Sequence, residues 1–168
     1  MWVYIIILGI IWVGLLIPVV KERRAWLTYA HGGTGIFFTS LLLNLALNQT
    51  GDLANIKWLE IIGFILFIPA SFLVASAIFA ITHGDLVTTG MMRIVRHPMY
   101  LGTAVAGFAL IFVFQSILSI VLSILAIALL WQASKREDDY NIEQFGKSYR
   151  KHMTIVPRWN FFKGLRKE

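Results

Sequence analysis

The chain has 168 residues, of which 58% are apolar and 14% are charged, and its formal net charge is +6. Soluble domains are usually about 45–50% apolar, so this composition excludes a water-soluble globular protein and predicts an integral membrane protein. The absence of cysteine excludes disulfides, a thiolate nucleophile and Cys-ligated metals. The histidines His31, His83, His97 and His152 have no metal-binding spacing, and we therefore expect no metal site.

Long apolar runs predict about five membrane-spanning helices in one all-α domain that covers residues 1–168. Crossing about 30 Å of hydrocarbon takes roughly 20 helical residues, and the last two runs are joined by a tight turn at Gln115-Ser116. A cleaved signal peptide is the alternative for the first run, but no basic residue precedes it. The predicted spans are Trp2–Val20, Tyr29–Leu47, Trp58–Ile81, Met99–Phe114 and Ile117–Ala133.

The chain turns polar from Lys135, and Arg136 to His152 carries apolar side chains at intervals of three or four residues. We expect an amphipathic helix there that lies against the membrane or caps the domain. Every lysine and arginine except Lys57 falls on one side of a five-span topology. The positive-inside rule then places the amino terminus outside and the carboxyl terminus in the cytoplasm. Because the charge follows the topology, we expect no nucleic-acid partner.

One polar stretch between apolar runs, Leu86 to Gly102, combines charge, proline, glycine and an aromatic ring; it reads LVTTGMMRIVRHPMYLG. Pro98 suits the first position of a helix, where its missing amide is not needed. The free amides that follow, the helix dipole and Arg96 predict a site for an anion such as a carboxylate. Gly102 would let a ligand or a helix come close, and Tyr100 presents a ring that can face a cation.

An acidic turn, Glu137-Asp138-Asp139, follows the last predicted span. The short hairpin should hold it beside the start of the preceding helix, where an acidic group can pair with Arg96 or bind an ammonium group or sugar hydroxyls. An anion site next to an acidic site fits S-adenosylmethionine, which has a carboxylate, an ammonium group, a sulfonium and a ribose. The alternative is that these residues are only topological anchors, helix caps and interfacial aromatics.

Two motifs resemble those of the isoprenylcysteine carboxyl methyltransferase and phospholipid methyltransferase superfamily. The first is LVTTGMMRIVRHPMYLG, and the second runs from Glu137-Asp138 through Phe145-Gly146 and Tyr149 to Val156-Pro157-Arg158. The resemblance covers about Gly84 to Arg158, the expected cofactor region. It implies an integral membrane methyltransferase that uses S-adenosylmethionine, releases S-adenosylhomocysteine and methylates a lipophilic or lipidated substrate at the cytosolic membrane face.

The resemblance also implies roles for single residues. Glu137 would contact the cofactor from the last span, and Arg96 is our candidate catalytic residue, which would orient an anionic substrate group. The remaining cofactor-binding candidates come from the first motif: Leu86 and Val87 would line the cofactor, and His97, Pro98, Met99, Tyr100 and Gly102 would hold or approach it.

The chain departs from the prenylcysteine-modifying members at one position. Those members carry an arginine one turn before the glutamate, thought to hold the substrate carboxylate, where this chain has Ala133. Lys135 or Arg136 is a candidate replacement at a different spacing. The acceptor therefore stays open between a prenylated cysteine, a phospholipid amine, an isoprenoid and a thiol, and the oligomeric state is not indicated. Two hypotheses of a different kind are a sterol-reductase-like enzyme with NADPH and a non-enzymatic membrane scaffold.

Overall fold

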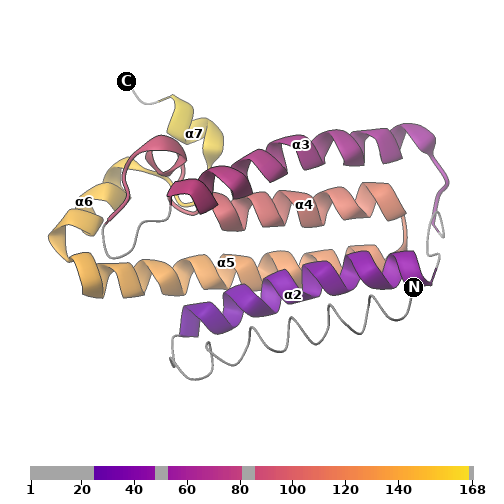
Figure 1. The fold of residues 1–168 in the computed structure, drawn as a ribbon, viewed down its shortest axis with the longest axis horizontal. Coiled ribbons are helices and arrows are strands. Elements are labelled where there is room, and N and C mark those ends of the chain that lie inside the picture. Colours follow the sequence, from indigo (N-terminus) through magenta and orange to yellow (C-terminus); the bar gives the residue numbers. More distant parts are fainter. Residues whose placement is uncertain (1–24, 48–52, 81–85, 167–168) are drawn as a thin grey trace.

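A computed structural model describes residues 25–47, 53–80 and 86–166, and the first predicted span, Trp2–Val20, lies outside them (Figure 1). The described residues form helices and connecting segments without a strand, as the sequence predicts. Four helices are long: α2 (Ala25–Ala46), α3 (Lys57–Ala80), α4 (Pro98–Phe114) and α5 (Ile117–Phe145). Three are short: η1 (Gly90–Arg93), α6 (Lys147–Ile155) and α7 (Phe161–Leu165).

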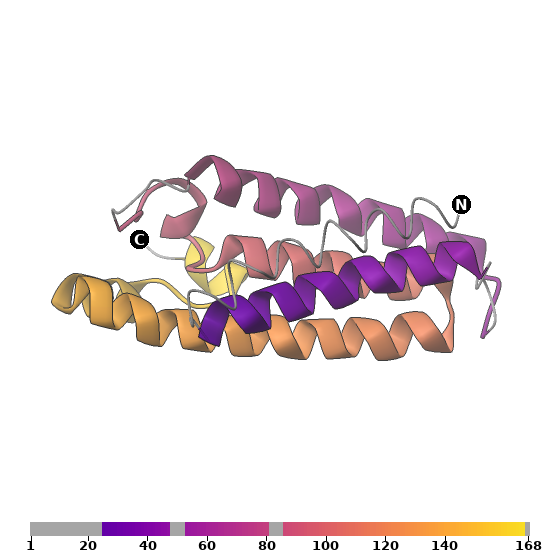
Figure 2. The same ribbon diagram turned by 60° about the horizontal axis from the view of Figure 1, so that its bottom comes forward.

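The four long helices run alternately in opposite directions along one bundle (Figures 1 and 2). The α3 helix packs on α4, α2 packs on α5, and the hairpin of α4 and α5 joins the two pairs. One end of the bundle holds the Gln115-Ser116 turn. The other end holds residues 86–98 and 135–166, and it is named the motif end because both sequence motifs meet there.

Glycines let the paired helices approach closely. A Cβ atom on Gly33 would lie 2.7 Å from Leu130 Cγ of α5, and a Cβ atom on Gly102 would lie 2.7 Å from the carbonyl oxygen of Ala70 in α3. Small residues at such crossings let helix backbones meet without a side chain between them, as is common in membrane bundles. These contacts fix α4 against α3 and α5 against α2, which positions the two motifs.

The Gln115-Ser116 turn is confirmed, and it ties the hairpin to its neighbours. Gln115 ends α4 in the left-handed region (φ 47°), and Ser116 caps α5 by accepting a hydrogen bond from the Ser119 amide. The Ser116 hydroxyl donates to Asn44 Oδ1 at 2.6 Å, and the Gln115 side chain bonds both the amide and the carbonyl of Ile56 at 3.0 Å. The turn therefore holds α2 and α3 as well as its own helices.

Two helices in the described part of the chain are long and apolar enough to cross a membrane, α5 and residues 57–78 of α3, and the shorter α4 is also apolar. Many large apolar side chains of α3, among them Ile68 and Phe72, are exposed, which fits contact with lipid rather than water. These features indicate a membrane protein. The full set of five spans stays a prediction.

The segment after Ala133 differs from the prediction in its helix boundaries. The α5 helix does not end at Ala133 but continues with polar residues to Phe145. The single amphipathic helix expected over Arg136–His152 is divided between the end of α5 and α6. The break lies at Gly146, whose φ of 55° is accessible to glycine at little cost. Because the chain turns there, Tyr149 of α6 folds back onto α5.

Candidate active site

Asp138 is the centre of a polar cluster at the motif end. It lies on α5 and is 1% exposed. Its Oδ1 accepts hydrogen bonds from His97 Nε2 at 2.9 Å and from the Tyr149 hydroxyl at 2.5 Å. Its Oδ2 accepts from Arg158 Nε at 2.8 Å and lies 2.7 Å from Arg158 Nη2. A buried carboxylate needs such partners. Here they come from the start of α4, from α6, and from the tail, which is the segment that follows α6.

Arg96 and Glu137 extend this cluster. Arg96 Nη1 lies 3.3 Å from Asp138 Oδ1, and the Arg96 side chain is 8% exposed. His97 Nδ1 lies 3.4 Å from Glu137 Oε2, so the imidazole stands between two carboxylates. Glu137 is 25% exposed and is the more accessible of the two. The ion cluster is defined as these residues together with the partners of Asp138: Arg96, His97, Glu137, Asp138, Tyr149 and Arg158.

The electrostatics of the ion cluster favour charged side chains. Burial alone would lower the pKa of His97, but the charge of Glu137 and the hydrogen bond to Asp138 outweigh it and raise the pKa above the usual 6.5. Burial opposes ionisation of Asp138, yet its bonds with His97, Tyr149 and Arg158 hold its pKa well below the usual range. Burial opposes ionisation of Glu137, but the charge of His97 and the hydrogen bonds with His97 and Tyr100 together outweigh it and lower the pKa of Glu137. The cluster therefore contains two carboxylates and an imidazole that favours its protonated form.

The tail that follows α6 is fastened to the start of α4. The backbone amide of Arg96 donates to the carbonyl of Pro157 at 3.0 Å. The Trp159 ring meets the Trp131 ring of α5 edge to face with centroids 5.1 Å apart, and the Arg158 guanidinium lies 5.2 Å from the Trp131 centroid. Because of these contacts, residues far apart in the sequence enclose the ion cluster.

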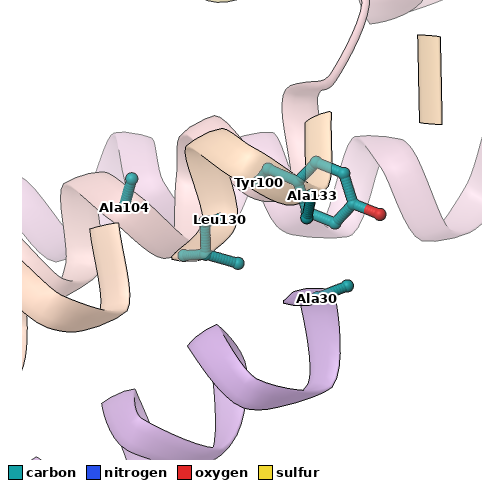
Figure 3. Close-up of a cluster of buried hydrophobic side chains, with 5 residues drawn as sticks. All are labelled: Ala30, Tyr100, Ala104, Leu130 and Ala133. Carbon is teal, nitrogen blue, oxygen red and sulfur yellow. The ribbon is translucent and has the colours of Figure 1, made fainter. Parts of the chain in front are cut away.

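A small apolar core lies beside the ion cluster. It consists of Ala30, Tyr100, Ala104, Leu130 and Ala133, and Trp159 and Met99 are among the residues that pack against it (Figure 3). In Figure 3 the Tyr100 ring lies by Ala133, and its hydroxyl points away from the other four side chains. The rings of Tyr100 and His97 are stacked with centroids 5.7 Å apart. Tyr100 therefore connects the apolar core with the ion cluster.

Several buried donors at the motif end have no hydrogen-bond partner within the residues that the structure describes. They are Arg96 Nε and Nη1, the Tyr100 hydroxyl and Trp159 Nε1, although Arg96 Nη1 is at ion-pair distance from Asp138 and the Tyr100 hydroxyl interacts with the Glu137 carboxylate. Buried polar groups are normally paired, and an unpaired set needs an explanation such as a ligand. Donors suited to a carboxylate or phosphate lie next to the accessible carboxylate of Glu137, so the site offers partners for both an anionic and a cationic ligand group.

The structure brings Arg96, His97, Tyr100 and Glu137 together, as the charge pattern predicts. Pro98 is the first residue of α4, the position expected for it.

Three other candidates lie elsewhere. Leu86 and Val87 are half-buried in the segment before η1, and their contact with the cofactor stays a prediction. Gly102 lies against Ala70 and Val74 of α3, so its close approach serves helix packing.

Sequence reasoning did not single out the central residue. It selected Glu137 from the acidic turn, whereas Asp138 makes most of the contacts. The buried positions of α5 carry the missing signal, since Ala126, Leu130 and Ser134 recur every four residues and Asp138 is next in the series. The sequence indicates Tyr149 and Arg158 only as residues of the second motif, and it does not indicate Trp159. No sequence pattern indicates that the tail returns to α5.

Ala133 occupies the position at which prenylcysteine-modifying members carry the substrate arginine. Ala133 is fully buried in the apolar core. Lys135 and Arg136 are exposed, and the Lys135 ammonium lies 5.5 Å from the Trp131 centroid. Arg158 from the tail and Arg96 are the arginines that lie at ion-pair distance from Asp138 of α5.

A family model described as phospholipid methyltransferase matches residues 58–148, which is more than half of the chain. The match begins in α3, includes the whole first motif, and ends at the start of α6, part-way through the second motif. The chain belongs to the phospholipid methyltransferase family. No curated protein and no solved structure matches it.

Membership of the phospholipid methyltransferase family confirms the resemblance to the superfamily and implies a membrane methyltransferase. It favours this activity over a reductase or a scaffold. The matched region contains Arg96, His97, Glu137 and Asp138, whereas Tyr149 and Arg158 lie beyond it. The matched region therefore contains four residues of the ion cluster, and the segment after it contributes the other two.

Proposed function

We propose that this protein transfers a methyl group from S-adenosylmethionine to a phospholipid headgroup at the cytosolic face of the membrane. The observation that carries the proposal is the ion cluster, which joins the two motifs around Asp138 beside donors that have no partner in the described chain. The family match supports a methyltransferase. An isoprenylcysteine carboxylate is the competing acceptor in the same superfamily.

The residues of the motif end have distinct tasks in this proposal. Bound S-adenosylmethionine would supply an activated methyl group on its sulfonium, so the protein mainly has to align the reactants and exclude water. Glu137, ionised and partly exposed, attracts the ammonium group of the cofactor. His97 and Tyr100 form the stacked wall next to it. Arg158 and Trp159 cover the ion cluster from the tail side and limit the access of water.

The acceptor is proposed from what the site has and what it lacks. Ala133 stands where prenylcysteine-modifying members have an arginine, and it is buried among apolar side chains. A substrate carboxylate would find no cation at that position. Arg96 has two donor nitrogens without a hydrogen-bond partner in the described part of the chain, and we propose that it orients an anionic group of the acceptor. A phospholipid provides such a group in its phosphate.

Binding of S-adenosylhomocysteine to the detergent-purified protein, measured by calorimetry, tests the cofactor assignment. We expect the wild type to bind, His97→Ala to lose binding and Glu137→Gln to bind about tenfold more weakly, since a charge-assisted contact is lost. Asp139→Asn is the control, because Asp139 is exposed beside the cluster. Melting temperatures show which variants are folded. A folded wild type without binding would overturn the proposal.

Methyl incorporation tests the acceptor separately. Labelled S-adenosylmethionine is supplied with vesicles that contain either phosphatidylethanolamine or a farnesylcysteine analogue. We expect label in the phospholipid. Label in the farnesylcysteine analogue alone would retain the cofactor assignment and replace the proposed acceptor.

A further inference from the structure

Trp159 is a partly buried aromatic residue of the tail that follows α6. Its ring packs against the apolar core that contains Tyr100 and makes an edge-to-face contact with Trp131. Its Nε1 is buried without a hydrogen-bond partner among the described residues. An indole nitrogen can only donate, so a protein acceptor or a ligand acceptor is required to satisfy it. The residue also lies beyond the part of the chain that the family model matches.

The other unpartnered donors of the motif end lie in the same region. The Arg96 amide is bonded to Pro157, two residues before Trp159. His97 stacks on Tyr100, and Tyr100 belongs to the core on which Trp159 packs. The side chains of Arg96, Tyr100 and Trp159 therefore belong to one network of contacts at the motif end. Arg96 and Tyr100 are both more than nine-tenths buried.

The chemistry of these donors defines the ligand group. The positive guanidinium of Arg96 and the neutral donors of Tyr100 and Trp159 suit a group with several negatively charged oxygen atoms, although the Asp138 and Glu137 carboxylates lie beside Arg96 and Tyr100. Such a group is a carboxylate or a phosphate. A cationic ammonium group is unsuited to this position because the positive Arg96 guanidinium repels it.

We infer that Trp159 completes an oxyanion site with Arg96 and Tyr100, and that its indole N–H donates to a carboxylate or phosphate oxygen of the bound ligand. The inference rests on the proposed function and adds a residue of the tail to the binding site. The position of the indole is set in advance by two neighbours. Arg158 is bound to Asp138 through two nitrogens, and Trp131 holds the Trp159 ring from the side.

This arrangement makes binding depend on the tail. Only when the tail lies across the start of α4 do all three donors surround the oxyanion. Two sources provide the oxyanion, the carboxylate of the cofactor or the phosphate of the acceptor lipid. The two sources are separable by experiment because only the first is part of S-adenosylhomocysteine.

The substitution Trp159→Phe tests the inference, because it keeps an aromatic ring against Trp131 and removes the N–H. Its matched control is Trp58→Phe, which makes the same change at an exposed position of α3, at the opposite end of the bundle. Calorimetry measures the binding of S-adenosylhomocysteine and of 5′-methylthioadenosine, which lacks the amino-acid carboxylate. Steady-state assays in mixed micelles measure the KM for phosphatidylethanolamine.

If the cofactor carboxylate is the ligand, Trp159→Phe weakens S-adenosylhomocysteine binding about tenfold and leaves 5′-methylthioadenosine binding unchanged. If the lipid phosphate is the ligand, both nucleosides bind as in the wild type and the KM for the lipid rises about tenfold. In either case Trp58→Phe stays within about twofold of the wild type. Unchanged cofactor affinity together with an unchanged KM overturns the inference and leaves the proposed function intact. A folded wild type that binds no S-adenosylhomocysteine overturns both.

Discussion

At the scale of single residues, Asp138 determines whether the motif end is assembled. Its two oxygens receive side chains from α4, α6 and the tail, and it is buried on α5. Removing one partner of a buried ion pair leaves the remaining charges without compensation. The resulting loss of stability is larger than the stability that the intact pair contributes. We therefore expect Asp138→Asn to destabilise the protein by about 3–5 kcal/mol.

Thermal unfolding in detergent checks this expectation. Asp139→Asn is the matched control, since it removes the same charge from the adjacent exposed position and should leave the melting temperature unchanged. Equal effects of the two substitutions would show that Asp138 is not the centre of the cluster.

His97 makes the stability of the protein depend on pH. The pKa of His97 is raised above its usual 6.5 in the folded state, because Glu137 and Asp138 outweigh the effect of burial. Because the pKa of His97 is higher in the folded state than in the unfolded state, protonation stabilises the fold. This stabilisation is complete at pH values below the pKa of the unfolded state, and it is lost as the pH rises through the pKa of the folded state. We expect the melting temperature to fall as the pH is increased from about 6.5. In His97→Gln this fall should disappear, and a fall that persists would assign it to another group.

At the scale of elements, the α3 and α4 pair depends on a glycine at its crossing. A Cβ atom on Gly102 would lie 2.7 Å from the Ala70 carbonyl oxygen and 2.8 Å from Val74 Cγ2. Gly102→Ala should therefore push the helices apart and destabilise the protein by about 1–3 kcal/mol, as overpacking does. The measurement is again the thermal unfolding midpoint.

Gly107 of the same helix provides the control, because a Cβ atom there would meet its nearest neighbours at 3.9 Å. Alanine is the better helix former, so Gly107→Ala should be neutral or stabilising by up to about 1 kcal/mol. If both alanine variants behave alike, the close contact at Gly102 is not what holds α4 to α3.

At the scale of the whole molecule, the two ends of the bundle have different chemistry. The motif end holds the ion cluster, whereas the other end holds neutral hydrogen bonds around Ser116 and Gln115. Lys57, 79% exposed, marks that second end, and the basic residues of the tail mark the motif end. The positive-inside rule predicts the motif end in the cytoplasm.

Single introduced cysteines test this orientation, because the chain contains none of its own. In intact cells a membrane-impermeant maleimide should label Lys57→Cys directly and label Lys151→Cys only after permeabilisation. Labelling of both cysteines from the same side would contradict an arrangement in which the two ends of the bundle lie on opposite faces of the membrane.

The sequence by itself determined the helical class, the α4 and α5 hairpin and its turn, and the two motifs that carry the family. Apolar runs, Pro98 at a helix start and the Gln115-Ser116 dipeptide are local signals, which depend on neighbouring residues and need no knowledge of the fold. The same local signals identified Arg96, His97 and Glu137 as one half of a charged site.

The tertiary structure decided which acidic residue is central and what completes the site. Asp138 is distinguished from Glu137 only by the face of α5 that is buried, and that face depends on the packing of α2 and α4. The return of Arg158 and Trp159 depends on the break at Gly146 and on contacts between residues far apart in the chain. Such contacts have no periodicity in the sequence, because they arise from the closing of the chain on itself rather than from local conformation.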